Sequence, residues 1–302
     1  MHIGRSALAA LVISALSLPA TAQDFGGTLK KVKETGAITI GFRESSVPFS
    51  YLDDAQKPIG FAMDICAKVV DEVKATLKLD KLTVNYNPVT SATRIPLIAN
   101  GTVDLECGST TNNPDRQKQV AFTNSHFLTA SRFVSKKSSK IKTIEDLKGK
   151  TVVSTSGTTN IRQLNEANTA RGLGLNIIAA KDHAEAFLMV ETDRAVAFVM
   201  DDILLAGLIA GSKDPAAYEI TDDAFSKPEP YGIMLRRDDP AFKAVVDKAT
   251  AAQFKSPDME KLYAKWFLTP IPPKGVDLNV PLSAALKRAF ANPTDSGDPA
   301  TY

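Results

Sequence analysis

Strand-like and helix-like runs of apolar residues alternate along the first half of the chain. The clearest helix-like run places Phe61, Ile65 and Val69 on one face, because apolar residues recur there at intervals of four. The predicted strands are 37–42, 82–89 and 102–108, and the predicted helices are 60–77 and 91–101. Strands that alternate with helices are typical of a parallel sheet covered by helices on its faces.

A similar order of elements follows residue 122, without a residue-level repeat. The strand-like run 126–135 has no clear helix behind it, so we expect it to cross between two units. The segment 144–164 predicts a strand, a glycine-containing loop and a helix; 176–181 and 195–201 are predicted strands, and 183–193 and 202–211 predicted helices. A strand at 231–240 and amphipathic helices at 241–254 and 259–267 complete the pattern, and we expect the tail from Ile271 to wrap the surface.

The length of the chain favours two lobes. About 280 residues remain after the predicted leader, which exceeds the size at which a single core usually stops growing. We therefore predict an α/β fold of two doubly wound lobes. The carboxyl ends of their strands should line a ligand cleft between the lobes.

The first residues have the features of a secretory signal peptide. A short basic start with Arg5 precedes an apolar run from Ala7 to Leu18, and small residues follow at Ala20 and Ala22. An uncleaved membrane anchor is the alternative, but the run is shorter than the roughly 20 residues that a span needs. We expect cleavage after Ala22 and an exported, periplasmic product that does not insert into the membrane.

Composition and charge exclude several classes of partner. The chain is 44% apolar and 23% charged, which is ordinary for a globular protein. Its net charge is +2, from 36 basic and 34 acidic residues, and it falls to +1 when Arg5 leaves with the signal. This balance gives no support for binding nucleic acid or an anionic membrane surface.

The chain has two cysteines, Cys66 and Cys107. In an oxidising compartment we expect a disulfide between them, which would stabilise the fold by roughly 3–4 kcal/mol in the chain-entropy model. The alternative is two separately buried thiols, which behave as small apolar groups. Neither cysteine has the spacing or the neighbouring histidines of a metal site.

Sequence signatures of enzymes are missing. The chain has no GxSxG elbow, no HExxH and no GxxxxGK[ST] loop, and only three histidines, one of which leaves with the signal. Nothing marks one serine as activated. We therefore expect no catalytic residues, no metal and no cofactor.

The stretch ECGSTTNNPDRQ (106–117) predicts an anion site. A strand that ends at Cys107 is followed by Ser109 and Thr111, and by a helix entry with proline in its first turn. Hydroxyls and free backbone N–H groups at such a point bind anions, and Arg116 could place its planar guanidinium on the same carboxylate. The alternative is that Asn112, Asn113 and Asp115 only cap the helix and Arg116 is solvated.

The second unit carries a comparable loop, STSGTTN (154–160), and a carboxylate at a strand end. Thr159 and its neighbours offer another anion-accepting edge, with an ordinary polar turn as the alternative. Asp201 follows a buried strand and could hold an ammonium group, or it could cap the next helix, as Asp202 equally could.

Several motifs together resemble the periplasmic solute-binding proteins of polar amino acid ABC importers (solute-binding protein family 3), and within them the glutamate/aspartate-binding subgroup. The resemblance is carried by GFRESSVPFSY (41–51), TSATRIPLIANG (90–101), DLECGSTTNNPDRQKQVAFT (104–123), STSGTT (154–159), AKDHAEAF (180–187), RAVAFVMDDILLAG (194–207) and WFLTPIPP (266–273). It implies a type II periplasmic binding protein-like fold, a signal segment 1–22, a discontinuous lobe 1 (23–129 and 229–302) and lobe 2 (130–228).

The resemblance also implies roles for individual residues. Arg116, with Ser109 and Thr111, corresponds to the group that binds the ligand α-carboxylate. Thr159 closes on that carboxylate from lobe 2, and Asp201 takes the α-ammonium. These residues recognise the α-carboxylate and α-ammonium groups that all amino acids share, so they do not select among side chains.

Four further residues match positions that face the side-chain carboxylate in the glutamate/aspartate subgroup: Arg43, Ser91, Arg94 and His183. Two buried arginines near a neutral side chain would leave positive charge unpaired, which costs several kcal/mol, so an acidic ligand is the consistent one. Surface or structural ion pairs of Arg43 and Arg94, with Glu44 and Asp104 as possible partners, are the alternative. His183 follows Asp182 at a predicted helix start, so the alternative for it is an ordinary residue of the first helical turn. If it binds the ligand, its imidazolium would be favoured, and binding should weaken as pH rises through the raised pKa.

The implied mechanism is lobe closure on glutamate or aspartate, with hinges near 129–133 and 227–231, followed by delivery to an inner-membrane ABC permease by a monomeric protein. Two rivals remain at this point. One is an enzyme on the same scaffold, similar to cyclohexadienyl dehydratases. The other is a sensor whose ligand-loaded form docks a receptor.

Overall fold

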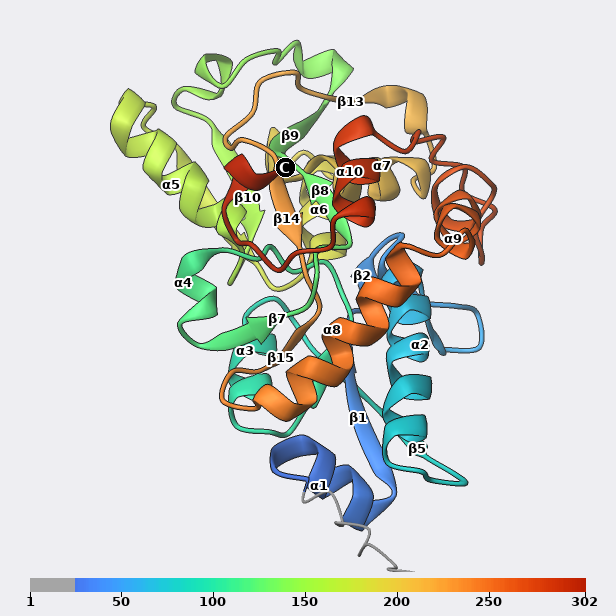
Figure 1. Cartoon of the computed structure of the whole chain (residues 1–302). Helices are drawn as coiled ribbons and strands as arrows, with labels where there is room; N and C mark the ends of the chain where they lie inside the picture. The colour runs from blue at the N-terminus through green and yellow to red at the C-terminus, as the bar shows by residue number, and fades with distance from the viewer. Residues whose placement is uncertain (1–24) are drawn as a thin grey trace, which may run out of the picture.

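The computed structural model describes residues 25–302, so the predicted signal segment 1–22 lies outside the described part of the chain. Two α/β lobes, each built around one five-stranded sheet, make up this part (Figure 1). Among residues 25–302 no helix is long and apolar enough to cross a membrane.

The first lobe has the strand order β5-β1-β6-β15-β7. Its central strand β1 runs parallel to β5 over a register from Ala37↔Thr83 to Phe42↔Pro88, and parallel to β6 on the other side. The strands are β1 (Ala37–Phe42), β5 (Thr83–Pro88), β6 (Leu105–Glu106), β7 (Val120–Phe122) and β15 (Met234–Arg236). Strand β15 returns from far along the sequence and pairs antiparallel, so this lobe is discontinuous in the chain.

Helices cover this first sheet and build its core. In α2 the side chains of Phe61, Ile65 and Val69 are fully buried, which is the face predicted from their spacing. The helices of this lobe are α1 (Gly27–Thr35), α2 (Phe61–Thr76), α3 (Arg94–Ala99), α4 (Pro114–Gln117), α8 (Pro240–Phe254), α9 (Asp258–Phe267) and α10 (Ala284–Ala291). The predicted disulfide is confirmed: Cys66 on α2 is bonded to Cys107 at the end of β6, with 6.3 Å between the Cα atoms.

The second lobe has the strand order β11-β10-β12-β9-β13. Strand β10 runs parallel to β11 and to β12, and the antiparallel strands β9 and β13 extend that edge. The elements are β9 (Ser131–Lys136), β10 (Thr151–Thr155), α5 (Thr159–Arg171), β11 (Asn176–Ala180), α6 (His183–Glu191), β12 (Ala197–Asp201), α7 (Asp202–Ala210) and β13 (Tyr218–Ile220). Short 3-10 turns lie at Lys137–Ser139, Glu145–Leu147 and Pro215–Ala217.

Two antiparallel strands pass between the lobes. They are β8 (Phe127–Thr129) and β14 (Glu229–Tyr231), and their residues pair from Phe127↔Tyr231 to Glu229↔Thr129. Because the chain enters the second lobe after β8 and leaves it through β14, the lobes are joined by a narrow ladder, which Figure 1 shows between them.

Two parts of the fold differ from the expectation. A small antiparallel sheet of β2 (Ser45–Ser46), β3 (Ser50–Leu52) and β4 (Pro58–Ile59) follows β1. The tail after Ile271 wraps the surface but also contains α10, which buries Leu286 and Phe290 and packs against α8 and β8. A last 3-10 turn lies at Pro299–Thr301.

Candidate functional site: a polar cavity between the lobes

The predicted site residues of lobe 1 lie at or shortly after the carboxyl ends of its parallel strands. Arg43 directly follows β1, and Ser91 and Arg94 follow β5. Ser109 and Thr111 follow β6, and Arg116 lies on α4 just beyond them. The carboxyl ends of parallel strands meet at one sheet edge, so local strand geometry explains why six residues from distant segments come together.

The same geometry recurs in lobe 2. Thr159 is the first residue of α5 after β10, His183 is the first residue of α6 after β11, and Asp201 is the last residue of β12. Each therefore lies where a parallel strand turns into a helix, on the edge that faces lobe 1.

These residues surround a small cavity between the lobes. It has about 190 Å³ of unfilled space and is lined by Ser91, Arg94, Ser109, Thr111, Thr158, Thr159, Asn160, His183, Met200, Asp201 and Leu204, all buried. Seven of the nine predicted ligand-binding residues are in this lining. Arg43 and Arg116 lie directly behind it.

Three guanidinium groups surround the cavity. Arg43 Nη2 donates to Ser91 Oγ at 2.9 Å and contacts His183 Nε2 at 3.3 Å. Arg94 Nη1 donates to Thr110 Oγ1 at 2.5 Å, and Arg116 Nη1 donates to the carbonyl of Thr111 at 2.8 Å. Burial lowers the pKa of Arg43 to about 10 and of Arg116 to about 9, so both remain protonated at neutral pH.

The alternatives of solvated or ion-paired arginines are wrong for these three. Arg43 and Arg94 are each 2% exposed and Arg116 is 7% exposed. Asp104, one of the possible partners, instead pairs with Lys31 at 2.8 Å. Asn113 does cap α4, since its side chain accepts from the Arg116 backbone N–H, but the Arg116 side chain is directed to the site.

Several buried donors around the cavity have no hydrogen-bond partner within residues 25–302: Arg43 Nη1, Arg94 Nε and Ser109 Oγ. Leaving buried donors unsatisfied is costly, above all on charged groups. An acceptor with negative charge would satisfy them, and a carboxylate fits this requirement.

Asp201 provides negative charge on the opposite wall. Its carboxylate accepts from Asn160 Nδ2 at 2.8 Å and from the hydroxyl of Tyr231. Burial and nearby Glu229 raise the pKa of Asp201 to about 6 despite these hydrogen bonds. It makes no capping hydrogen bond, whereas Asp202 accepts from its own helix start at Ile203 N, so Asp201 is free to hold a cation.

His183 links the lobes rather than acting only as a first-turn residue. Because a guanidinium can only donate, His183 Nε2 accepts from Arg43, and the Nδ1–H donates to Thr155 Oγ1 at 2.8 Å. Burial, Arg43 and Arg94 lower the pKa of His183 well below its usual value. Without a ligand His183 is therefore neutral, the opposite of the direction expected for a ligand-bound imidazolium.

Direct contacts across the cavity hold the lobes together. Thr111 Oγ1 and Thr159 Oγ1 are 3.4 Å apart, and Arg116 Nη2 donates to the carbonyl of Gly157 at 3.3 Å. Further out, Arg162 and Asp115 form an exposed ion pair between the lobes at 3.2 Å.

Sequence reasoning missed the residues that support the site from behind. Thr110 and Glu106 hold Arg94, while Asn160 and Tyr231 hold Asp201. Glu106 and Thr110 lie within the stretch that predicted the anion site, so their proximity to it was visible. Tyr231 lies 30 residues from Asp201, and only the ladder of β8 and β14 brings the two side chains together.

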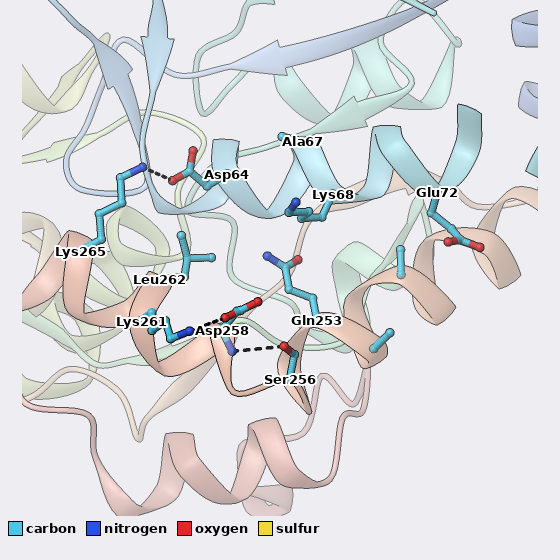
Figure 2. Close-up of a pocket in the computed structure, with 12 residues that line it drawn as sticks. Asp64, Ala67, Lys68, Glu72, Gln253, Ser256, Asp258, Lys261, Leu262 and Lys265 are labelled. Carbon is cyan, nitrogen blue, oxygen red and sulfur yellow. Dashed lines mark hydrogen bonds and ion pairs between the residues drawn. The ribbon is translucent and has the colours of Figure 1, made fainter. Parts of the chain in front are cut away.

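A larger groove lies elsewhere on lobe 1, between α2 and the helices α8 and α9 (Figure 2). It has about 1270 Å³ of unfilled space but contains none of the predicted site residues. Its lysines are mostly exposed and already paired, Lys265 with Asp64 at 2.6 Å and Lys261 with Asp258 at 2.8 Å. Within residues 25–302 no group of His, Cys, Asp and Glu could hold a metal ion.

Comparison with known proteins agrees with this geometry. Residues 38–269 match the family described as bacterial extracellular solute-binding proteins, family 3. The chain belongs to this family. It is 52% identical to an L-glutamate/L-aspartate-binding protein of Pseudomonas aeruginosa over 98% of both chains, and 48% identical to a glutamate/aspartate import solute-binding protein of Salmonella typhimurium over 89% of both.

The fold is likewise that of the family. An ancestral amino acid-binding protein described as a precursor of cyclohexadienyl dehydratase superposes with a TM-score of 0.68 at 27% identity. The match covers 80% of this chain and 99% of that one. The curated relatives are solute-binding proteins rather than enzymes, so the family assignment favours binding over catalysis.

Proposed function

We propose that this protein captures an acidic L-amino acid, glutamate or aspartate, in the periplasm and delivers it to the permease of an ABC importer. The observation that carries the proposal is the set of three buried guanidiniums, two of which (Arg43 and Arg94) have unsatisfied donors, opposite a buried carboxylate. Names of relatives that bind glutamate and aspartate support the same ligand class.

Charge balance selects the ligand within the amino acids. At the side-chain end of the cavity, Arg43 and Arg94 contribute +2, Glu106 contributes −1 and neutral His183 contributes nothing, which leaves +1. An amino acid with an ionised side-chain carboxylate carries a net charge of −1 and neutralises this set. A neutral or basic side chain leaves buried charge unpaired, which costs several kcal/mol.

Each wall of the cavity then has a role. Ser109, Thr111, Arg116 and Thr159 would bind the α-carboxylate, and Asp201 would bind the α-ammonium group. Arg43, Ser91, Arg94 and His183 would receive the side-chain carboxylate. Arg43 is hydrogen-bonded both to Ser91 and to His183. These three residues therefore lie together, which supports a single subsite for the side-chain carboxylate of the ligand.

Binding would proceed by lobe closure. We propose that lobe 1 comprises 23–129 and 229–302, that lobe 2 comprises 130–228, and that the ladder of β8 and β14 is the hinge. The ligand would first meet the arginines of lobe 1, and closure would bring Thr159, His183 and Asp201 onto it. The interlobe contacts of Thr111 with Thr159 and of Arg43 with His183 support a closed arrangement.

Export through the predicted signal, with cleavage after Ala22, would place the protein in the periplasm. The Cys66–Cys107 disulfide supports this location, because such bonds persist in oxidising compartments.

Calorimetry of the mature protein with glutamate, aspartate, glutamine, asparagine and arginine tests the proposal. We expect tight binding of the two acidic ligands only, and Arg94→Ala should weaken glutamate binding about a hundredfold, because it removes a buried charge partner. Arg171→Ala is the matched control: this arginine is exposed and pairs with Glu145 on the surface, so the variant should bind like wild type. Binding of glutamine or arginine as tightly as glutamate would refute the proposal.

A further inference from the structure

Glu106 is a buried carboxylate that the proposed ligand contacts do not use. It lies at the end of β6, and its side chain is fully buried. One oxygen, Oε2, accepts from Thr110 Oγ1 at 2.7 Å, and the other, Oε1, has no hydrogen-bond partner within residues 25–302. Such a group is expensive to bury, so its position beside the arginines requires a reason.

Thr110 connects this carboxylate to the side-chain end of the cavity. Its hydroxyl donates to Glu106 and accepts from Arg94 Nη1, which gives a continuous chain from Glu106 to Arg94. Arg94 also donates to the carbonyl of Ser109 at 3.4 Å, while its Nε remains unsatisfied. The orientation of Arg94 therefore depends on a hydroxyl that Glu106 holds in place.

The local backbone is shaped around this carboxylate. A Cβ atom on Gly108 would lie 2.3 Å from Glu106 Oε1 and 2.9 Å from Arg43 Cγ. Glycine at this position therefore leaves room for Glu106 to fold back between the two arginines. Glu229, another buried acid near Arg116, is instead held by Gln163 at 3.0 Å.

We propose that Glu106, acting through Thr110 on Arg94, is a positioning residue that sets how strongly the site prefers an acidic to a neutral side chain. This inference rests on the proposed function. The carboxylate offsets one of the two positive charges at the side-chain end, so the arginines can remain buried before a ligand arrives. It also repels the side-chain carboxylate of glutamate, a repulsion that glutamine does not feel.

Removing this charge should increase selectivity rather than reduce it. In Glu106→Gln the amide oxygen can still accept from Thr110, but the negative charge is gone. The ratio of the dissociation constant for glutamine to that for glutamate should rise about tenfold. The charge of Glu106 lies in a buried site close to the side-chain end, so its removal affects the charged side chain of glutamate but not the neutral side chain of glutamine. Glu106→Asp keeps the charge and is the matched control, in which the ratio should not rise.

Thr110→Val tests the connection separately. It leaves every charge in place but removes the acceptor of Arg94, so glutamate binding should weaken and the ratio should fall. If circular dichroism shows that Glu106→Gln does not fold, Thr110→Val still tests the inference. An unchanged ratio of the two dissociation constants in Thr110→Val overturns it. A ratio that stays constant or falls in folded Glu106→Gln also overturns it.

Wild-type protein in the same titrations separates this inference from the proposed function. A wild type that binds no acidic amino acid rejects the proposed function. A wild type that prefers glutamate, together with an unchanged ratio in Glu106→Gln, rejects only the role of Glu106.

Discussion

At the scale of single residues, the site is defined by burial rather than by unusual residue types. Asp201 is 3% exposed, and its pKa is raised to about 6, because burial opposes its charge more than Tyr231 and Asn160 favour it. Its ability to hold an ammonium group therefore depends on pH within the range that laboratory titrations reach.

We expect glutamate affinity to fall as pH decreases from 7 to 5. The ammonium group of the ligand needs an ionised Asp201. Below about pH 6 the Asp201 carboxyl of the free protein is mostly protonated, and it must lose this proton before the ligand can bind. Tyr231 and Asn160 donate hydrogen bonds to Asp201, and the charges of Glu229 and Asp202 raise its pKa. Arg94 and Arg116 also interact with its charge and stay protonated throughout this pH range. His183 has a pKa well below its usual value without ligand and does not produce this trend.

Isothermal titration at several pH values measures this dependence. Asp201→Asn is the comparison variant: it should bind glutamate weakly and with a flatter pH profile. An affinity of the wild type that is constant between pH 7 and 5 would contradict the assignment of Asp201 to the ammonium group.

The sequence allowed prediction of most residues that line the cavity. Ser109, Thr111, Thr159 and Asp201 follow strand ends where polar residues stand out, whereas Ser91, Arg94 and His183 were assigned by the resemblance to the family. The sequence could not reveal Tyr231 as the partner of Asp201, nor Thr155 as the partner of His183, since these contacts depend on how distant strands pack. The neutral state of His183 could not be predicted from the sequence either. It results from burial and from Arg43 and Arg94, which come close to His183 only in the folded chain.

At the scale of elements, the tail beyond the family match contacts the loop that carries Arg116. The carbonyl of Asp295 accepts from Asn112 Nδ2 at 2.8 Å and from Gln117 Nε2 at 3.0 Å, next to Arg116. The family match ends at residue 269, so this contact lies beyond the residues that it covers. The tail thus fixes the loop that carries Arg116, the arginine that we propose for the ligand α-carboxylate.

Gly297→Ala should weaken glutamate binding about tenfold, because a less fixed loop must be ordered when the ligand binds. The new Cβ would lie 2.9 Å from Asn113 Cα, and Asn113 caps the helix that carries Arg116. Gly26→Ala is the matched control, since nothing lies within 4 Å of its Cβ position. Calorimetry measures both variants, and equal affinities would contradict this role of the tail.

The patterns of apolar residues predicted most strands and helices of both sheets, because most of these elements bury apolar side chains. Strand β5 was predicted from its alternation although none of its residues is fully buried. The helix α10 was not predicted, because its eight residues lie among prolines and polar residues. Its stability comes from packing of Leu286 and Phe290 against the rest of the lobe, which short local patterns do not show.

At the scale of the whole molecule, α7 of the second lobe approaches the first lobe very closely. A Cβ atom on Gly207 would lie 2.7 Å from the carbonyl oxygen of Val47 and 3.1 Å from its Cβ. Val47 belongs to the connection between β2 and β3 in lobe 1. Full closure in the proposed mechanism therefore requires a residue without a side chain at this point.

Gly207→Ala should bind glutamate at least about tenfold more weakly while its ligand-free form is not destabilised, because alanine favours a helix by roughly 0.5–1 kcal/mol over glycine. Gly211→Ala is the control, since its Cβ would meet no atom closer than 3.4 Å. Small-angle scattering should show ligand-induced compaction of the control only. Equal compaction and affinity in both variants would contradict a steric limit on closure.

The cavity between the lobes also has a kinetic consequence. Its lining comes from both lobes, and every lining residue is buried, so the proposed amino acid ligand would be enclosed by side chains of both lobes. Departure of the ligand then requires the lobes to separate first, and the lifetime of the complex is limited by the rate of that opening. Ligands that make more contacts to both lobes would dissociate more slowly, because these contacts oppose opening. A transporter that accepts such a ligand must therefore stabilise the open form before the ligand can leave.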